Sequence, residues 1–258
     1  MIFQDANERI KLSGFNNLTK VVSFNLYDFC ITVNDKQREE YINYIDEVYN
    51  AKKIALISEK ICEIIEANIL SISVQDYDPV GASTMTLMSD IKGGKWDDKK
   101  AVSSIAMHLD KSHITAHTYP EATDPNGICS FRVDIDIATC GEITPLSAVN
   151  YLFKAFECDV VFIDYVVRGF TRMADGRKIY NDSYLNSIQD YIKPEILADY
   201  QFRSDLNIGR ENIWQTKLMV KPFGPERYLM DPKDAHHPGV AQKMEILTKD
   251  MKEVFHLS

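Results

Sequence analysis

The sequence predicts an α+β fold class, a mainly antiparallel β-sheet sandwiched with helices. Segments in which apolar and polar residues alternate, as in half-buried strands, outnumber segments with helical periodicity. Several strand segments are joined by turns too short to hold a crossover helix, which favours antiparallel pairing. The helical segments each carry one apolar stripe and are expected to cover one face of the sheet.

The first part of the chain is expected to form strands on either side of two helices. The expected strands are 21–27, 29–33, 69–78, 84–89 and 101–109. Residues 37–67 have apolar residues at helical spacing, with a break near Asn50. The polar residues 90–100 are expected to form a surface loop or a lid.

The second part of the chain is expected to hold further strands and three helices. The expected strands are 112–119, 128–139, 160–170 and 212–221, with Pro120 ending the first of them. The first expected helix begins at Thr144, a good N-cap. The other two cover residues 184–198, with an interruption near Pro194, and residues 240–255. Asp175-Gly176 is typical of a hairpin turn.

Composition limits the classes of function. The 258 residues carry a formal net charge of -9 and no recurring basic patch, so we expect no nucleic-acid partner. No apolar run is long enough for a membrane span, and the acidic, amide-rich first residues lack the features of a signal peptide. Five scattered cysteines without C-x-x-C spacing indicate reduced thiols. We therefore expect a cytoplasmic protein with no membrane association.

Residues 108–121 stand out because they hold three of the six histidines within a strand pattern. A period of two places Ser112 on one face of that strand and His117 on the other. The two side chains can converge only if the chain bends or breaks near Ser112. Together with Cys140, they supply a candidate nucleophile, a base and a thiol.

Other motifs are absent or have simpler interpretations. The chain has no G-x-G-x-x-G, no P-loop, no G-x-S-x-G elbow and no H-E-x-x-H. Arg132, Asp134 and Asp136 share one face of a predicted strand. An ion-paired or solvated face is the favoured interpretation there, and a Mg²⁺ site is the alternative.

At these residues the sequence resembles the bacterial S-adenosylmethionine decarboxylases, in their long, enterobacterial-like form. Lys111-Ser112-His113-Ile114 with His117-Thr118-Tyr119-Pro120-Glu121 resembles the self-cleavage motif of the family. Thr139-Cys140-Gly141, followed by Pro145-Leu146, resembles its second motif. The resemblance is strong over about residues 100–220 and weaker outside them.

The resemblance implies a proenzyme that cuts its own chain. The Ser112 hydroxyl would attack the carbonyl of Lys111, and elimination and hydrolysis would leave a pyruvoyl group at residue 112. One catalytic domain, 1–258, would thus become a β chain, 1–111, and an α chain, 112–258. The pyruvoyl ketone would act as a Schiff-base cofactor that accepts the electrons released when CO2 leaves the substrate.

The resemblance also implies roles for individual residues. Ser112 becomes the pyruvoyl group, and Lys111, Ser104 and His117 serve processing. Cys140 is the catalytic acid that protonates the substrate's α-carbon, and Glu121 contacts the substrate ribose. We further expect that the cut frees residue 112 to turn toward His117.

Substrate, assembly and metal remain open at this point. The implied substrate is S-adenosylmethionine, which would become the aminopropyl donor for spermidine synthesis. Ornithine or arginine is the alternative, because the processing residues act on the enzyme's own chain; a non-cleaving regulatory subunit is the third hypothesis. The resemblance implies an α/β sandwich, a homo-oligomer of cleaved protomers, and Mg²⁺ as an activator with no ligand set identified.

Overall fold

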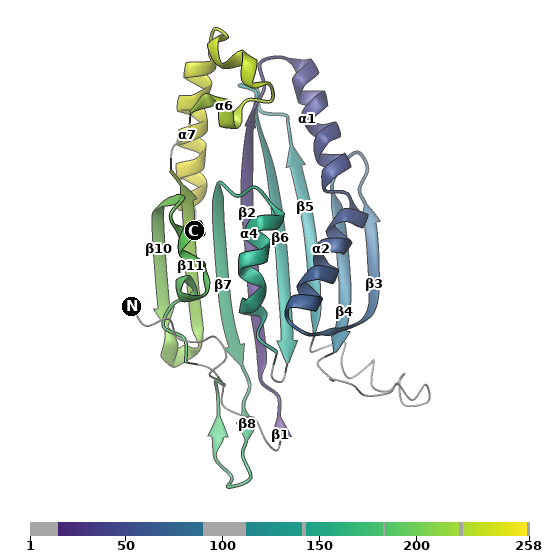
Figure 1. Ribbon diagram of the computed structural model, residues 1–258, viewed down its shortest axis with the longest axis vertical. Helices are drawn as coiled ribbons and strands as arrows, with labels where there is room; N and C mark the ends of the chain where they lie inside the picture. The colour runs from purple at the N-terminus through teal and green to yellow at the C-terminus, as the bar shows by residue number, and fades with distance from the viewer. Residues whose placement is uncertain (1–14, 90–111, 141–142, 183, 222–223, 257–258) are drawn as a thin grey trace.

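An antiparallel sheet spans the length of the molecule (Figure 1). The structure, a computed structural model, describes residues 15–89, 112–140, 143–182, 184–221 and 224–256. Within them, the strand order of the main sheet is β10-β11-β7-β2-β6-β5-β4-β3, and every neighbouring pair is antiparallel. The strands are β2 (Thr19–Ile31), β3 (Asn68–Asp76), β4 (Ala82–Ser89), β5 (His113–Glu121), β6 (Ile128–Cys140), β7 (Val160–Arg168), β10 (Tyr200–Ile208) and β11 (Ile213–Val220). This confirms the predicted fold class.

Three helices cover one face of this sheet, here called the first face (Figure 1). They are α1 (Asp35–Val48), α2 (Ala51–Ile64) and α4 (Val149–Ala155). The break predicted near Asn50 is real, because the Asn50 side chain accepts a hydrogen bond from Lys53 N and caps α2. Tyr49 stacks on Phe131 of β6 with ring centroids 4.8 Å apart, which joins the helical layer to the sheet.

The last helix, α7 (Val240–His256), lies against the opposite side, the second face. Its Phe255 ring lies 6.4 Å from the ring of Phe202 on β10. Its Val254 lines a pocket with Tyr27 and Arg132, whose side chains project from the second face. The expectation that all helices share one face is therefore wrong for α7.

The burial pattern of β2 explains how both faces come to be covered. Val22, Phe24 and Leu26 are buried against the first face, as alternation predicts. Beyond Asp28 the buried positions become Phe29 and Ile31, which lie on the other side of the strand. Since a strand alternates its side chains, this switch shows that the end of β2 is covered from the second face.

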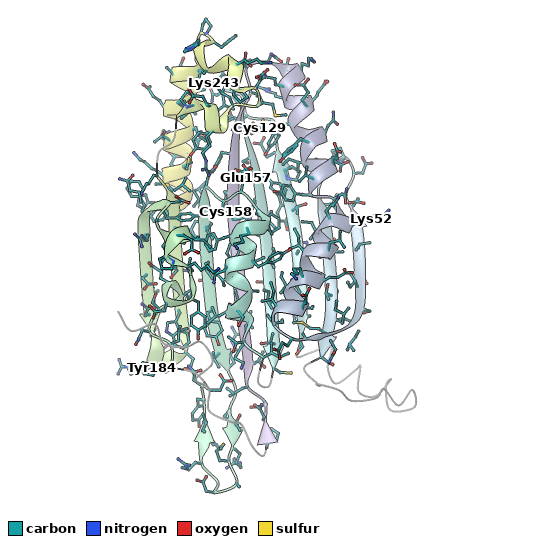
Figure 2. The ribbon with its side chains drawn as sticks, in the orientation of Figure 1. Lys52, Cys129, Glu157, Cys158, Tyr184 and Lys243 are labelled. Carbon is teal, nitrogen blue, oxygen red and sulfur yellow. The ribbon has the colours of Figure 1, made fainter. Side chains whose placement is uncertain are left out.

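β2 is also the strand that holds the sheet together. It pairs along its whole length with β6 and along most of its length with β7. One strand from the first 111 residues, β2, therefore lies between two strands from the later residues, β6 and β7. The packed side chains include the labelled Cys129 and Cys158 (Figure 2). One hydrophobic core runs through strands from both parts of the chain.

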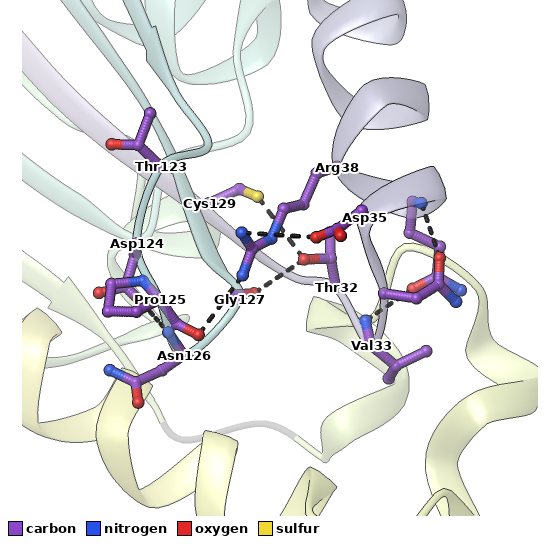
Figure 3. A network of polar contacts seen from close by, with 12 residues as sticks. Thr32, Val33, Asp35, Arg38, Thr123, Asp124, Pro125, Asn126, Gly127 and Cys129 are labelled. Carbon is purple, nitrogen blue, oxygen red and sulfur yellow. Dashed lines mark hydrogen bonds and ion pairs between the residues drawn. The ribbon is translucent and has the colours of Figure 1, made fainter.

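A turn closes the end of the sheet at which β5 ends and β6 begins (Figure 3). Thr32 donates to the carbonyl of Gly127 through both its backbone N (2.9 Å) and its Oγ1 (3.1 Å). The Arg38 guanidinium donates to the carbonyl of Pro125 at 3.4 Å. Gly127 has a φ of +77°, a conformation that favours glycine.

A second, small sheet extends from the opposite end of the molecule (Figure 1). It has the order β1-β8-β9. Its strands are β1 (Phe15–Asn16), β8 (Thr171–Arg172) and β9 (Lys178–Ile179). The predicted turn at Asp175-Gly176 lies between β8 and β9, as expected for a hairpin.

Several element predictions were wrong in detail. The strands expected at 21–27 and 29–33 are one strand, β2, and β5 continues through Pro120. Thr144 makes no side-chain cap and precedes a 3-10 turn, η1 (Pro145–Ala148). The helix expected at 184–198 is only η2 (Ile188–Tyr191) and α5 (Pro194–Leu197), and β10 was missed.

The loop at 90–100 and the strand at 101–109 lie outside the described residues. The remaining short elements are η3 (Gly209–Glu211), α6 (Pro225–Tyr228) and η4 (Pro232–His236).

Candidate active site

Ser112 and Cys140 meet at one end of the sheet. β5 begins directly after Ser112 and β6 ends at Cys140, and because the two strands are antiparallel, these positions lie at the same edge. Ser112 Oγ lies 3.1 Å from Cys140 Sγ. The Cys140 backbone N also donates a hydrogen bond to Ser112 Oγ at 3.3 Å. Two of the three candidate residues are thus in direct contact.

Ser112 is held in place away from solvent. The residue is 1% exposed, and its carbonyl accepts a hydrogen bond from Met88 N at 3.2 Å. Its hydroxyl therefore faces a thiol and a backbone N–H rather than bulk water. Such a site suits a reaction of the hydroxyl with its own chain, because competing water is excluded.

His117 lies elsewhere on β5. The burial of β5 alternates, and His117 is on the partly exposed second face, opposite Asp134 and Ser83 in the neighbouring strands. Its Nδ1 lies 3.2 Å from the hydroxyl of Tyr77. Five residues separate it from Ser112, which is roughly 17 Å at about 3.4 Å per residue.

The expectation that residue 112 turns toward His117 is therefore wrong within one chain. A change in the direction of residue 112 cannot span the length of five strand residues. Ser112 faces Cys140 instead.

Glu121 lies still farther away, at the end of β5 opposite to Ser112. Nine residues separate the two, roughly 30 Å along a strand. Its Oε1 accepts hydrogen bonds from the backbone N and the hydroxyl of Thr123. Lys111 and Ser104, the other expected processing residues, lie outside the described residues.

The face that carries Arg132, Asp134 and Asp136 is ion-paired, as favoured from the sequence. Arg132 Nε donates to Asp134 Oδ1 at 2.9 Å, and the hydroxyl of Ser23 donates to Asp136. Within the described ranges, no group of three or more His, Cys, Asp or Glu side chains is arranged to hold a metal ion.

Cys140 differs from the other cysteines in its surroundings. None of the five forms a disulfide bond among the residues that the structure describes. Burial raises the pKa of Cys129 to about 11 and that of Cys62 to about 12. Burial also raises the pKa of Cys30 and of Cys158. Cys62, Cys129 and Cys158 behave as small apolar residues of the core, and the half-buried Cys30 packs against that core. Cys140, also half-buried, differs from them in its contact with Ser112.

Two sets of residues near these sites were not predicted from the sequence. Tyr77 precedes the turn at Asp78-Pro79 and carries no local sign of its contact with His117. Lys20 forms a buried ion pair with Asp182, at 2.6 Å, next to the end of β6. The burial of Lys20 could have been predicted from the sequence. Lys20 follows the same alternation as Val22, Phe24 and Leu26, so it occupies a position expected to be buried.

The fold and the Ser112–Cys140 contact define an α+β protein with a partly buried hydroxyl–thiol pair at the edge of an antiparallel sheet. A model of the S-adenosylmethionine decarboxylase family matches residues 40–169. The chain is 46% identical over 254 residues to an S-adenosylmethionine decarboxylase proenzyme of Stenotrophomonas maltophilia, with 96% of each chain covered. It is 45% identical over 258 residues to one of Hahella chejuensis, with 97% of each covered.

The chain belongs to the S-adenosylmethionine decarboxylase family. Among solved structures, it is similar to an adenosylmethionine decarboxylase from Aquifex aeolicus, with a TM-score of 0.36 and 16% identity over 69% of this chain and 100% of that chain. It is also similar to a monomer of the Trypanosoma brucei AdoMetDC-delta26 protein, with a TM-score of 0.37 over 79% of this chain and 66% of that chain. Across the described residues, no helix is both long and apolar enough to cross a membrane.

Proposed function

We propose that this chain cuts itself between Lys111 and Ser112 and then decarboxylates S-adenosylmethionine, giving the aminopropyl donor for spermidine synthesis. The contact between Ser112 Oγ and Cys140 Sγ, at 3.1 Å, is the observation that carries this proposal. It joins the residue that would become the cofactor to the residue that would supply a proton. The identity of about 45% to proenzymes of that name, over nearly the whole chain, supports the substrate.

In the proposed cleavage, Ser112 Oγ forms a bond to the carbonyl carbon of Lys111 and the C–N bond breaks, with the hydroxyl proton passing to the freed amine. The Cys140 backbone N–H orients the attacking oxygen. Loss of the Cα proton and breakage of the Cβ–O bond then release residues 1–111 with a carboxylate end. Addition of one water and loss of ammonia leave a pyruvoyl group on residues 112–258.

That group supplies a ketone that binds the substrate's amine and withdraws electrons as CO2 leaves. Cys140 would then donate a proton to the substrate's α-carbon. A free thiol, with an ordinary pKa of about 8.5, is mostly protonated at neutral pH and can donate. The contact with Ser112 supports this role, because residue 112 would carry the reacting group.

The roles proposed for His117 and Glu121 require a second copy of the chain. Both residues lie on β5, well separated from Ser112 of the same chain. If they serve cleavage and ribose binding, they do so at the Ser112–Cys140 end of a neighbouring copy. We therefore propose a homo-oligomer of cleaved protomers in which each active site takes Ser112 and Cys140 from one copy and His117 and Glu121 from another.

The second face of the sheet supports this assembly. Side chains of β5 and β6 on that face are only partly covered, and Tyr119 is 45% exposed. Arg132 lies over the Tyr119 ring, 5.2 Å from its centroid. A face with aromatic and paired charged groups suits contact with another protein chain.

No step of the proposed reaction uses Mg²⁺. We also propose that the protein acts in the cytoplasm.

The deciding experiment is a denaturing intact-mass measurement, repeated after borohydride reduction with and without substrate. We expect two chains, 1–111 and 112–258, the second carrying a reducible carbonyl. Turnover of S-adenosylmethionine, ornithine and arginine then identifies the substrate, and turnover of ornithine or arginine alone would overturn the assignment. A chain that stays intact and inactive would instead support a regulatory subunit. Metal-free and Mg²⁺-supplemented assays test for activation by the ion.

A further inference from the structure

A tyrosine hydroxyl contacts the ring of His117. The hydroxyl of Tyr77 lies 3.2 Å from His117 Nδ1. Tyr77 directly follows β3, and His117 is at the centre of β5, so the contact joins a loop to the sheet. Both residues are half-buried. In the described part of the chain, no other residue forms a hydrogen bond with the His117 ring.

The loop that carries Tyr77 is fastened to β5 beside His117. This loop joins β3 to β4, and Tyr77 N donates to the carbonyl of Gly81 at 2.8 Å. Ala82 N donates to Thr118 Oγ1 at 2.7 Å, and Thr118 is the residue after His117. Gly81 has a φ of +110°, and a Cβ there would lie 2.9 Å from the Thr118 carbonyl oxygen and 3.1 Å from Tyr77 Cδ2. The loop therefore lies against β5 too closely for a side chain at this position, and it holds the Tyr77 ring beside His117.

The second ring nitrogen of His117, Nε2, has no hydrogen-bond partner among the described residues. Asp134 is opposite His117 on β6, but Arg132 donates to both of its carboxylate oxygens. The Tyr119 ring is nearly parallel to the His117 ring, at 18°, with its centroid 6.3 Å away. Nδ1 thus faces an oxygen, and Nε2 is available on the partly exposed second face.

The contact with Tyr77 bears on which nitrogen of His117 carries the proton. In a neutral imidazole one nitrogen has a proton and the other a free electron pair, and the hydrogen bond of one decides the state of the other. If Nδ1–H donates to the Tyr77 oxygen, Nε2 keeps its electron pair and can act as a base. If the Tyr77 hydroxyl donated to Nδ1, the proton would be on Nε2, where none of the described residues accepts it.

We propose that Tyr77 is a positioning residue that accepts a hydrogen bond from His117 Nδ1–H and so holds Nε2 as the base. The inference rests on the proposed function, in which His117 serves the cleavage of a neighbouring copy. Nε2 takes the proton from Cα of residue 112 in that copy. The electrons of the C–H bond form the Cα=Cβ bond, and the carboxylate of residues 1–111 leaves with the electrons of the Cβ–O bond. The imidazolium still donates from Nδ1–H to Tyr77, so one hydrogen bond serves before and after the transfer.

The nitrogen that carries the proton can be read by ¹⁵N NMR of the histidine rings, without measuring activity. Ser112→Ala, which lacks the nucleophile, provides one intact chain, and His117→Gln in that background identifies the His117 signals. With the ring neutral, we expect the proton on Nδ1. Adding Tyr77→Phe keeps the aromatic ring but removes the oxygen, and we expect most of the proton to move to Nε2, its usual place in an unconstrained histidine. Tyr119→Phe removes a hydroxyl without a hydrogen-bond partner among the described residues, and should leave the proton on Nδ1.

The rate of cleavage tests whether the contact serves the reaction. In a timed cell-free synthesis followed by intact mass, we expect Tyr77→Phe to cleave about 10-fold more slowly than the original chain. The double variant His117→Ala/Tyr77→Phe should show the same residual cleavage as His117→Ala, because Tyr77 acts only through His117. Tyr44→Phe is the matched control. Tyr44 lies on α1 and is 46% exposed, and its variant should cleave at the original rate.

The proposal is overturned if the proton is on Nε2 in folded Ser112→Ala, or if folded Tyr77→Phe keeps either the original proton position or the original rate of cleavage. A greater loss in the double variant than in His117→Ala would also overturn it, because Tyr77 would then act on its own. Failure of the original chain to cleave would contradict the proposed function, whereas the NMR result would still show whether Tyr77 sets the proton position on His117.

Discussion

Ser112 Oγ lies 3.1 Å from Cys140 Sγ, across the edge where β5 begins and β6 ends. The hydroxyl proposed to cut the chain and the thiol proposed to protonate the product are thus neighbours before any reaction. The Cys140 backbone holds the same oxygen through its N–H. The side chain of Cys140 can therefore be changed without removing every contact that orients Ser112.

Cleavage and decarboxylation should separate in variants of these two residues. Cys140→Ala keeps the backbone donor, so we expect the chain to cleave while kcat for decarboxylation falls by roughly 10²–10⁴. Ser112→Ala has no nucleophile and should remain a single chain of 258 residues. Intact mass and a CO2-release assay provide the two readings. A fully active Cys140→Ala variant would contradict the role of the thiol.

A mixture of two inactive variants should regain activity if two copies build each site. Ser112→Ala and His117→Ala each spoil a different part of the proposed site. When they are co-expressed, some sites pair an intact Ser112 with an intact His117, and we expect cleavage of a fraction of the chains. The control is each variant expressed alone. The absence of any cleaved chain in a mixed oligomer that demonstrably forms would contradict the shared site.

Alkylation of the native protein should be selective for one cysteine. Burial raises the pKa values of Cys62 and Cys129 to about 12 and about 11, so few thiolates exist there at pH 8. Cys140 is half-buried. We expect iodoacetamide to modify Cys140 first, with the other cysteines reacting only after unfolding. Peptide mapping over time measures the order, and early labelling of Cys129 would refute it.

Two neighbouring carboxyl groups at the far end of the sheet should make stability depend on pH. Burial raises the pKa of Asp159 to about 6, partly offset by Arg227, whose guanidinium lies 3.3 Å away. Burial and the Asp159 carboxylate raise the pKa of Asp28 well above its usual range. The folded chain thus holds protons that the unfolded chain has released, so this contribution to stability is complete below about pH 4 and is lost as the pH rises through about 6.

Asp28→Asn should remove much of this effect. We expect the variant to be more stable than the original at pH 8, on the order of 1–3 kcal/mol, with a smaller difference at pH 5. Urea unfolding at the two pH values measures the difference. Equal differences at pH 5 and pH 8 would show that Asp28 does not titrate in this range.

Gly127 should tolerate a methyl group far less well than Gly176. Both have positive φ values. A Cβ at Gly127 would lie 2.5 Å from the carbonyl oxygen of Thr32, whereas none of the described atoms lies within 4 Å of one at Gly176. We expect Gly127→Ala to cost roughly 3 kcal/mol or more and Gly176→Ala about 1 kcal/mol. Equal losses in urea unfolding would mean that the turn in Figure 3 can rearrange.

Local patterns predicted much of the fold. The helices α1, α2 and α7 follow apolar spacing and, for α1 and α2, capping asparagines at Asn34 and Asn50. β10 was not predicted because its residues after Tyr200 are exposed on both faces of the strand. Its sequence therefore has little alternation of apolar and polar residues. Its pairing with β11 supplies the order that its own pattern lacks.

The candidate site was only partly predictable for a similar reason. Residue types and the family resemblance singled out Ser112, His117 and Cys140, but spacing does not tell which of them meet. The contact of Ser112 with Cys140 depends on the register between β5 and β6. The contact of His117 with Tyr77 joins residues 40 positions apart. Such long-range pairings are properties of the assembled sheet.

The order of strands gives self-cleavage an unusual outcome. A cut before Ser112 would leave β2 of the shorter chain inserted between β6 and β7 of the longer one, with β4 still bonded to β5. The product would be a heterodimer whose two members were never separate and never had to find each other. Once unfolded, it would have to reassemble by collision of two chains, so its recovery would depend on concentration. The uncut chain would thus fold into an assembly that the two cleaved chains could not readily form again after unfolding.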